Sequence, residues 1–356
     1  MSNSIDDLWQ DLRSGRPYFI AEAGVNHLGS LEMGERLIRE AAQAGAQAIK
    51  FQSYKAKNLC IADAPRFWDW EGEEDPSGSQ IDSYSLLDSF GEDEHRELYN
   101  LCQKYGIEFM STPFDNEATD YLDRIGTRAY KIASCDLTNF PLLEHVARKN
   151  KIMMLSTGAA DLKEIDEAVE LIAQHTDKIV IMHCNLKYPT ANGEINLDMI
   201  NSIREFFIEK YGDKFVFGLS DHTMNVHTPS FACIMGANVV EKHYTVDKTL
   251  KLSADHWLSV DPEEVTKITE LMNLAHTMKG SNIKTSTESE ERARLYARRS
   301  IVSLGKISSG EILSVENIAC KRPGTGLSPK LFNSIIGKRA VRDISADTLL
   351  HIEDFE

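Results

Sequence analysis

The chain lacks the features that would mark it as a membrane, secreted or disulfide-bonded protein. No apolar run approaches the length of about 18 residues that a membrane-spanning helix needs. The start, MSNSIDDLWQDLRSGRP, has no basic region followed by an apolar core, which a secretory signal would have. The six cysteines include no Cys-x-x-Cys pair. We therefore expect a soluble cytoplasmic protein with reduced thiols.

Basic residues are in deficit. The chain has 39 Lys and Arg against 55 Asp and Glu, a formal net charge of -16. Such a field repels phosphate backbones and anionic membrane surfaces, so neither nucleic acid nor a membrane is an expected partner. A small anionic substrate stays compatible with this charge, because a few buried cations reverse the potential locally.

The length and composition suit a large domain followed by a small one. The 356 residues are 42% hydrophobic and 26% charged, which is ordinary for a globular protein. Strand and helix patterns alternate up to about residue 260, and short alternating strands with turn residues return near the C-terminus. The sequence predicts a main domain over residues 1–280, a linker over 281–297 and a small β-rich domain over 298–356.

Eight β-rich stretches recur along the first three quarters of the chain. Most are separated by amphipathic helical patterns, and several helices stop at a glycine just before the next strand. Alternating near-continuous apolar strands and helices favour a parallel sheet covered by helices, and eight is the number that closes a (β/α)₈ TIM barrel. An open doubly wound sheet is the alternative. The stretches are 18–24, 46–52, 107–112, 128–134, 151–158, 178–185, 214–222 and 237–245.

Each of these stretches ends in polar or ionisable side chains. A closed parallel barrel brings all the C-terminal strand ends to one rim, where barrel enzymes place their chemistry. Residues two apart on a strand face the same way, so Ser220 with His222, and Glu241 with His243, form same-face pairs. Single serines or threonines at strand ends are usually capping residues. Polar residues at the ends of all eight strands favour a functional site instead.

Two histidines on neighbouring strands form the first candidate group. His222 and His243 end the seventh and eighth stretches at the same depth, and Glu22 arrives from the first. Two neutral imidazoles facing one point suit a borderline divalent ion such as Mn²⁺, Zn²⁺ or Co²⁺. The alternative is that these histidines are hydrogen-bonded structural groups.

Two lysines with several hydroxyls form the second group. Point charges with several donors suit a phosphate or another anion. Alternatively, a buried lysine pairs with Glu22 or Glu241, or forms a Schiff base. No Walker or Rossmann glycine fingerprint is present, so a nucleotide is not indicated. The group consists of Lys50, Lys131, Thr112, Ser134, Ser156 and Ser220.

The motifs IAEAGVNHLGS, AIKFQSYKA, STPFD, AYKIAS, LSTG, GLSDHT, EKHYTVDK and KRPGTGLSP occur in this order along nearly the whole chain. Together they resemble the sialic acid (N-acetylneuraminate) synthase family, which includes legionaminic and pseudaminic acid synthases. The resemblance implies condensation of phosphoenolpyruvate with an N-acetylated amino sugar to give a nine-carbon 2-keto acid and phosphate. It also implies a TIM barrel followed by a small antifreeze-like (SAF) domain, in a homodimer whose small domains cap the partner's barrel.

The resemblance also implies roles for individual residues. His222 and His243 would bind the metal, Mn²⁺ or else Mg²⁺ or Co²⁺, and Glu22 would be the general base. The residues expected to bind phosphoenolpyruvate are Lys50, Thr112, Lys131, Ser134, Ser156, Asn185 and Ser220. Those expected to bind the sugar are Gln52, Asp136, Tyr188, Asp255 and, from the neighbouring subunit, Arg322.

Three stretches depart from the family pattern. The usual Gly-Ser-Gly-Glu is Ala-Ser-Cys-Asp at 133–136, the usual His-Cys-Thr followed by Ser or Asn is His-Cys-Asn-Leu at 183–186, and the usual Gly-Pro-Asp-His is Ser-Ala-Asp-His at 253–256. These changes lie near the sugar, so the sequence specifies the reaction better than the acceptor. A metal-dependent barrel aldolase or lyase that does not use phosphoenolpyruvate, and a non-catalytic carbohydrate-binding protein, are the alternatives.

The stretch between the second and third strands is too long for an ordinary barrel loop. It begins SYKAKNLC, ends DSYSLLDSF and carries Trp68 and Trp70. Long loops of this kind often form lids or substrate walls. The two tryptophans are also the residues that would simply pack the loop down.

Overall fold

The structure, a computed structural model, describes residues 4–68, 78–253 and 255–356. It contains two compact units, Met1–Gly280 and Ser281–Glu356. Trp70 lies outside the described residues.

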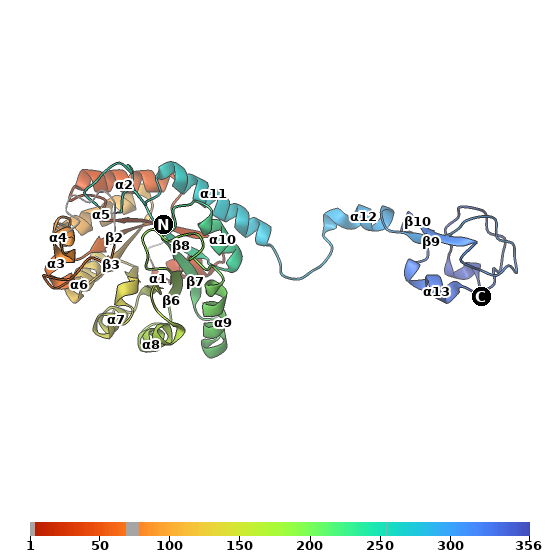
Figure 1. Ribbon diagram of the computed structural model, residues 1–356, viewed down its shortest axis with the longest axis horizontal. Coiled ribbons are helices and arrows are strands. Elements are labelled where there is room, and N and C mark those ends of the chain that lie inside the picture. Colours follow the sequence, from red (N-terminus) through yellow and green to blue (C-terminus); the bar gives the residue numbers. More distant parts are fainter. Residues whose placement is uncertain (1–3, 69–77, 254) are drawn as a thin grey trace. The chain divides into compact units, whose positions relative to one another are not determined.

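The first unit is a closed barrel of eight parallel strands (Figure 1). Each strand pairs with the next one along the chain, and β1 also pairs with β8, from Tyr18 opposite Val239 to Glu22 opposite His243. This closure confirms the predicted barrel and excludes the open sheet. The strands are β1 (Tyr18–Gly24), β2 (Ala48–Ser53), β3 (Glu108–Pro113), β4 (Ala129–Ile132), β5 (Ile152–Ser156), β6 (Ile179–Cys184), β7 (Val216–Asp221) and β8 (Val239–His243).

Amphipathic helices cover the outside of the barrel (Figure 1). In α2, for example, Ser30 caps the N-terminus by accepting from the Met33 amide, and the helix buries Leu37, Ile38 and Ala41. The outer helices are α2 (Leu31–Gln43), α5 (Glu92–Tyr105), α6 (Asn116–Ile125), α7 (Phe140–Ala147), α8 (Leu162–Ile172), α9 (Met199–Tyr211), α10 (Thr228–Met235) and α11 (Pro262–Lys279). Their apolar faces and the outward-facing strand residues form one large core.

The N-terminal end of the barrel is filled with apolar side chains. Helix α1 (Ile5–Arg13) contributes Leu8, Trp9 and Leu12 to a cluster with the inward-facing strand residues, which include Met154 and Met182. Because this end is packed with hydrophobic groups, the polar groups of the barrel interior are left to the opposite, C-terminal end of the strands.

The long segment after β2 contains two short helices, α3 (Ala56–Leu59) and α4 (Gln80–Ser85). The Tyr84 ring meets those of Tyr54 and Trp68 edge-on, with centroids 5.6 Å and 5.7 Å away. The described part of this segment is therefore packed down by aromatic contacts.

The second unit has its own hydrophobic core, which includes Ile301, Ile307, Leu313 and Leu350. Its two-stranded sheet is antiparallel, with Ser300 opposite Lys321. The elements are η2 (Glu288–Glu290), α12 (Glu291–Tyr296), β9 (Ser300–Ser303), β10 (Ile318–Lys321), η3 (Pro329–Leu331), α13 (Phe332–Ile335) and η4 (Ile352–Asp354). The elements η2 and α12 lie within the segment predicted as a linker.

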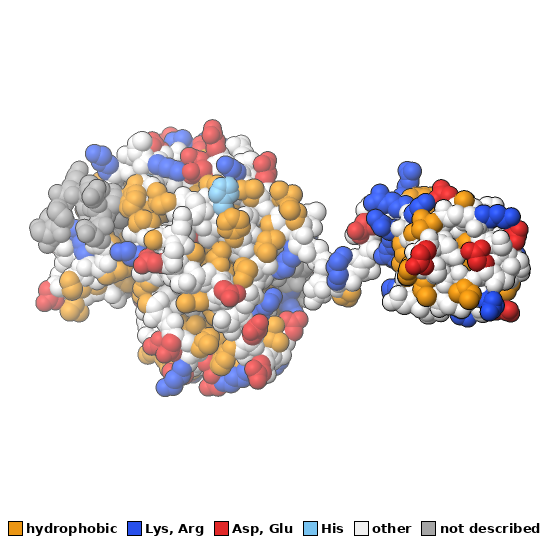
Figure 2. All heavy atoms as spheres, turned by 45° about the vertical axis from the view of Figure 1, so that its right-hand side comes forward, with side chains coloured by type: hydrophobic (Ala, Val, Ile, Leu, Met, Phe, Trp, Pro, Cys, Tyr) orange, Lys and Arg blue, Asp and Glu red, His pale blue; other side chains and the backbone are white. Residues whose placement is uncertain are grey.

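The surface of each unit mixes charged and hydrophobic side chains on the face in view in Figure 2. Among the helices of the described residues, none has the length and hydrophobicity needed to cross a membrane.

Candidate active site

Four buried charged side chains meet at the C-terminal end of the barrel. Glu22, Lys50, Lys131 and Glu241 come from four different strands, and each is at most 4% exposed. Lys50 Nζ lies 2.7 Å from Glu22 Oε2 and 3.8 Å from Glu241 Oε2. Lys131 Nζ donates to Glu241 Oε1 at 2.8 Å. Two lysines and two carboxylates thus alternate in one buried cluster.

The two carboxylates of this cluster titrate differently. Burial raises the pKa of Glu22 to about 7, although Lys50 opposes the shift. Burial also acts to raise the pKa of Glu241, but Lys131 and Lys50 outweigh it and hold that pKa below its usual value. Near neutral pH, Glu22 is therefore able to exchange a proton while Glu241 stays an anion.

The four hydroxyl residues predicted for the anion site differ in their contacts. Thr112 Oγ1 accepts from Lys50 at 2.8 Å, and Ser220 Oγ donates to Glu241 Oε1 at 3.3 Å. The buried Ser156 Oγ has no hydrogen-bond partner among the described residues. Ser134 Oγ accepts from the Gly158 amide at 2.9 Å. The first three hydroxyls are available to an anion placed at the lysines.

Gly158 lets two further loops approach Ser134. A Cβ at Gly158 would lie 2.8 Å from Ser134 Oγ and 2.9 Å from the Leu186 amide nitrogen, both too close for any other residue. The loops after β4, β5 and β6 are therefore in contact at this point. On the loop after β6, the backbone amide of Leu186 is the polar group nearest to Gly158.

Asn185, directly after β6, contacts both its own loop and His222. Its Nδ2 donates to the Glu194 carbonyl at 3.0 Å, and its own carbonyl oxygen lies 2.7 Å from His222 Nδ1. The side-chain amide therefore holds the β6–α9 loop, and the backbone carbonyl orients a histidine.

His222 and His243 lie side by side, as the strand register requires. Their ring centroids are 5.5 Å apart, and the Tyr188 ring lies 4.0 Å from His222 and 5.7 Å from His243. Burial lowers the pKa of His243 well below its usual value, helped by the positive charges around it. The His243 ring is therefore neutral, and its Nδ1 lies 3.5 Å from Asp255 Oδ2.

These two imidazoles fit a divalent metal only in part. His222 Nδ1 is held by a backbone carbonyl, the arrangement that orients a ligand histidine with its other nitrogen outward. His243 Nδ1 is buried without a hydrogen-bond partner among the described residues. Over residues 4–68, 78–253 and 255–356, however, no set of three His, Cys, Asp or Glu side chains is arranged to hold a metal. His222 and His243 could therefore supply only two ligands to such an ion, and the others would have to be water or substrate.

The predicted sugar-binding residues are only partly brought together. Gln52 Nε2 donates to Glu22 Oε1 at 3.1 Å, and burial raises the pKa of Asp255 to about 6. Asp136 accepts from Asn139 at 3.0 Å on the turn after β4, and burial raises its pKa. Arg322 is an exposed residue of the second unit. Tyr188, Asp255 and Gln52 thus lie with the charged groups and the histidines.

The sequence left two charged features of this site without a role. Glu241 binds Lys131 and lies near Lys50, but the sequence treated it only as an alternative partner for a lysine. Asp221 and Lys242 form a second buried ion pair, with 2.7 Å between Oδ2 and Nζ. The signal for that pair was available: two opposite charges at neighbouring strand ends, on the face that alternation turns away from the barrel interior.

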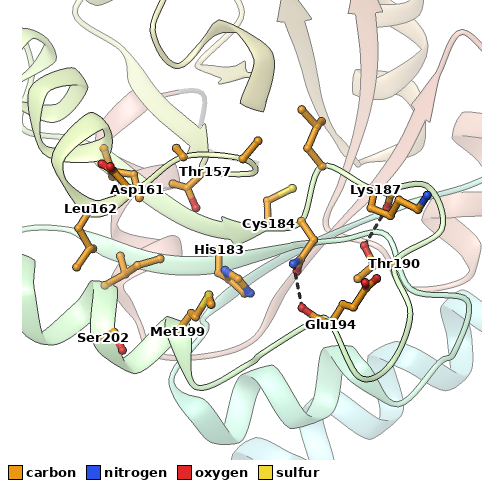
Figure 3. Close-up of a pocket in the computed structure, with 16 residues that line it drawn as sticks. Thr157, Asp161, Leu162, His183, Cys184, Lys187, Thr190, Glu194, Met199 and Ser202 are labelled. Carbon is orange, nitrogen blue, oxygen red and sulfur yellow. Dashed lines mark hydrogen bonds between the residues drawn. The ribbon is translucent and has the colours of Figure 1, made fainter. Parts of the chain in front are cut away.

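A cavity of about 830 Å³ lies at the C-terminal ends of β5 and β6 (Figure 3). It is lined by the loops after β5 and β6 and the start of α9, with Thr157, His183, Lys187 and Met199 among its residues. Of the described residues predicted for the site, only Asn185 lines it. This cavity adjoins His222, which contacts the lining residues Cys184 and Asn185, but neither Lys50, Lys131 nor His243 lines it.

A parallel (β/α)₈ barrel with buried lysines, carboxylates and neutral imidazoles at its C-terminal end defines a barrel enzyme for an anionic substrate. The sequence profile of the NeuB family matches residues 37–284, and that of the SAF domain matches residues 298–356. The chain belongs to the NeuB family.

Named relatives and a solved structure agree with this assignment. The chain is 35% identical to the N,N'-diacetyllegionaminic acid synthase of Legionella pneumophila, over 95% of this chain and 94% of that one. It is 36% identical to the enzyme of the same name from Campylobacter jejuni, over 93% and 98%. The crystal structure of an N-acetylneuraminic acid synthetase from Leptospira borgpetersenii, in complex with citrate, superposes with a TM-score of 0.68 at 35% identity, covering 78% of this chain and 90% of that one.

Proposed function

We propose that the chain is a nonulosonic acid synthase that condenses phosphoenolpyruvate with an N-acetylated amino sugar and water. The observation that carries the proposal is the pairing of Lys50 with Glu22 and of Lys131 with Glu241, in the barrel mouth that also holds His222 and His243. The family membership supports the same reaction.

The anionic substrate would occupy the lysine side of the mouth. Lys50, Lys131, Thr112, Ser156 and Ser220 offer cations and hydroxyls to its phosphate and carboxylate. Ser134 and the backbone amides of Gly158 and Leu186 beside it would line the opposite wall of the phosphate site. Asn185 would support this side indirectly, by holding its loop.

Glu22 would act as the general base. C3 of phosphoenolpyruvate forms the new bond to the aldehyde carbon of the open-chain sugar, and the aldehyde oxygen takes up a proton. Water adds at C2 and gives a proton to Glu22, whose pKa of about 7 suits that transfer near neutral pH. The C2–O bond to phosphate then breaks as the new C2 hydroxyl gives its proton to the departing phosphate, leaving the 2-keto acid and free phosphate.

His222 and His243 would hold a divalent ion, Mn²⁺ first and Mg²⁺ or Co²⁺ as alternatives. When bound, that ion supplies Lewis-acid polarisation of the sugar aldehyde. Gln52, Tyr188 and Asp255 would orient the sugar beside it, with Asp136 at the edge. Arg322 would reach the sugar from a partner chain in a domain-swapped homodimer, and the compartment we propose is the cytoplasm.

The acceptor we propose is N-acetylmannosamine or a 6-deoxy diacetamido hexose. The test is phosphate release from phosphoenolpyruvate with Mn²⁺ across a panel of these sugars, with a no-sugar control and product mass by mass spectrometry. We expect phosphate release with one class of sugar. The mass of the product should equal that of phosphoenolpyruvate, the sugar and water together, less that of phosphate. A folded protein that releases no phosphate with any sugar would instead favour a barrel lyase or a carbohydrate-binding protein.

A further inference from the structure

A buried ion pair joins β7 and β8 immediately behind the two histidines. Asp221 and Lys242 face each other in the strand register, and Lys242 Nζ lies 2.7 Å from Asp221 Oδ2. The two side chains are 0% and 1% exposed. On each strand the charged residue stands one position before a histidine, His222 or His243.

The pair faces away from the barrel interior. Alternation puts Asp221 on the same face as Leu219, and Lys242 on the same face as Val240. Leu219 and Val240 belong to the core between strands and helices. The ion pair therefore lies in an apolar layer, where it touches neither the charged cluster nor a substrate in the barrel mouth.

Thr223, the residue after His222, is hydrogen-bonded to both members of the ion pair. Lys242 donates to the Thr223 carbonyl oxygen, and its Nζ lies 3.4 Å from Thr223 Oγ1. The Thr223 amide donates to Asp221 Oδ1 at 2.8 Å. One lysine of β8 thus fixes the residue on each side of His222, and its own strand continues directly into His243.

We infer that the Asp221–Lys242 pair is a positioning device for the two imidazoles. It fixes the backbone of both histidines relative to each other, and so sets the 5.5 Å separation of their rings. This inference rests on the proposed function, since the metal is the ligand that needs this separation. Ligand histidines held by a supporting shell bind metal more tightly than the same residues on a loose backbone.

A role in stability alone is the competing explanation. Buried ion pairs contribute little net stability compared with apolar residues of similar volume, because desolvation offsets the attraction. A purely structural pair would affect unfolding and leave the metal affinity of the folded protein unchanged. A positioning pair would change the affinity in folded protein.

The experiment measures the Kd of Mn²⁺ for the full chain by electron paramagnetic resonance, together with thermal unfolding without metal. We expect Lys242→Met to weaken Mn²⁺ binding by about 10- to 100-fold. The matched control is Lys248→Met, which removes the lysine of a more exposed ion pair with Glu264 shortly after β8. The control should bind Mn²⁺ like the unaltered protein.

A second variant covers the case in which Lys242→Met does not fold. Asp221→Asn keeps the shape and the acceptor for the Thr223 amide but removes the charge that holds Lys242, and we expect Mn²⁺ binding about 10-fold weaker. Unchanged Kd values in a folded variant of either kind would overturn the inference.

Failure of the proposed metal site has a different signature. If the unaltered protein does not bind Mn²⁺, or if His222→Ala with His243→Ala binds it equally well, the metal site itself is wrong and the inference goes with it. If those substitutions abolish binding while Lys242→Met does not, only the positioning role is wrong.

Discussion

Lys131 Nζ lies 2.8 Å from Glu241 Oε1, and both side chains are buried in the barrel mouth. Lys50 forms the equivalent contact with Glu22 at 2.7 Å. The free protein thus neutralises its two lysines with its own carboxylates. An arriving anionic substrate would share these cations with Glu22 and Glu241, so the cluster combines substrate binding with the stability of a buried charge network.

Replacing Lys131 should therefore affect stability and binding together. Lys131→Met leaves Glu241 buried with only the more distant Lys50 as a cation, and we expect the free energy of unfolding to fall by about 3 kcal/mol. Loss of a charged donor should raise KM for phosphoenolpyruvate by about 10- to 100-fold. Denaturant unfolding and steady-state kinetics measure the two effects.

A double variant separates the effect on stability from the effect on substrate binding. Adding Glu241→Leu to Lys131→Met removes the unpaired carboxylate and should restore most of the lost stability. It should not restore KM for phosphoenolpyruvate. Recovery of both quantities would contradict a role for Lys131 in anion binding.

Removing the proposed base should stop turnover without removing the metal site. Glu22→Gln keeps the size of the side chain and one acceptor oxygen, which Lys50 can use, but an amide does not accept the proton from water. We expect kcat to fall by about 100-fold or more, with Mn²⁺ binding retained. Glu35→Gln, at a carboxylate paired with Lys104 away from the barrel mouth, is the control. Undiminished kcat in the first variant would remove Glu22 from this role.

The raised pKa of Glu22 predicts a pH profile. The base must be ionised, so kcat/KM should fall as the pH drops below about 7. The contribution of Glu22 to the free energy of unfolding has the opposite pH dependence. Its folded pKa is above the ordinary 4.5, so the folded protein binds more protons between the two values, and the contribution of Glu22 to stability declines as the pH rises through that window. A kcat/KM that stays constant from about pH 6 to about pH 8 would contradict the assignment.

Arg322 tests the proposed swapped dimer. Arg322→Ala and Glu22→Gln should each be inactive as homodimers if Arg322 completes the site of the partner. Mixed dimers then contain one site with both residues intact, so combining the two variants should restore part of the activity. Phosphate release measured after unfolding and refolding the mixture checks this, and no recovery despite mixed-dimer formation would contradict the swap.

Much of the barrel was predictable because its signals are local. Eight β-rich stretches and the helices between them set the topology, and β1 pairs with β8 as closure requires. Convergence of Lys50 and Lys131 at one end follows from that topology. The partner of each lysine does not, because alternation gives the face of a side chain but not its reach. Glu241 contacts both lysines and shares Lys50 with Glu22.

The contacts of loop residues were harder to predict, because strand alternation does not extend into the loops. Asn185 follows β6 directly, but its amide binds the Glu194 carbonyl nine positions later, a contact set by the path of the loop. The Asp221–Lys242 pair follows from alternation at two neighbouring strand ends, but the contacts of Lys242 with the Thr223 carbonyl and hydroxyl depend on the path of the loop after β7.

The most direct test of the proposed chemistry is a reaction run in water enriched in heavy oxygen, with phosphoenolpyruvate, the accepted sugar and Mn²⁺. Water activated by Glu22 adds at C2, so the early product should carry the heavy oxygen at the keto position and the released phosphate should carry none. Heavy oxygen in the phosphate would mean that the P–O bond breaks instead, and would contradict the account.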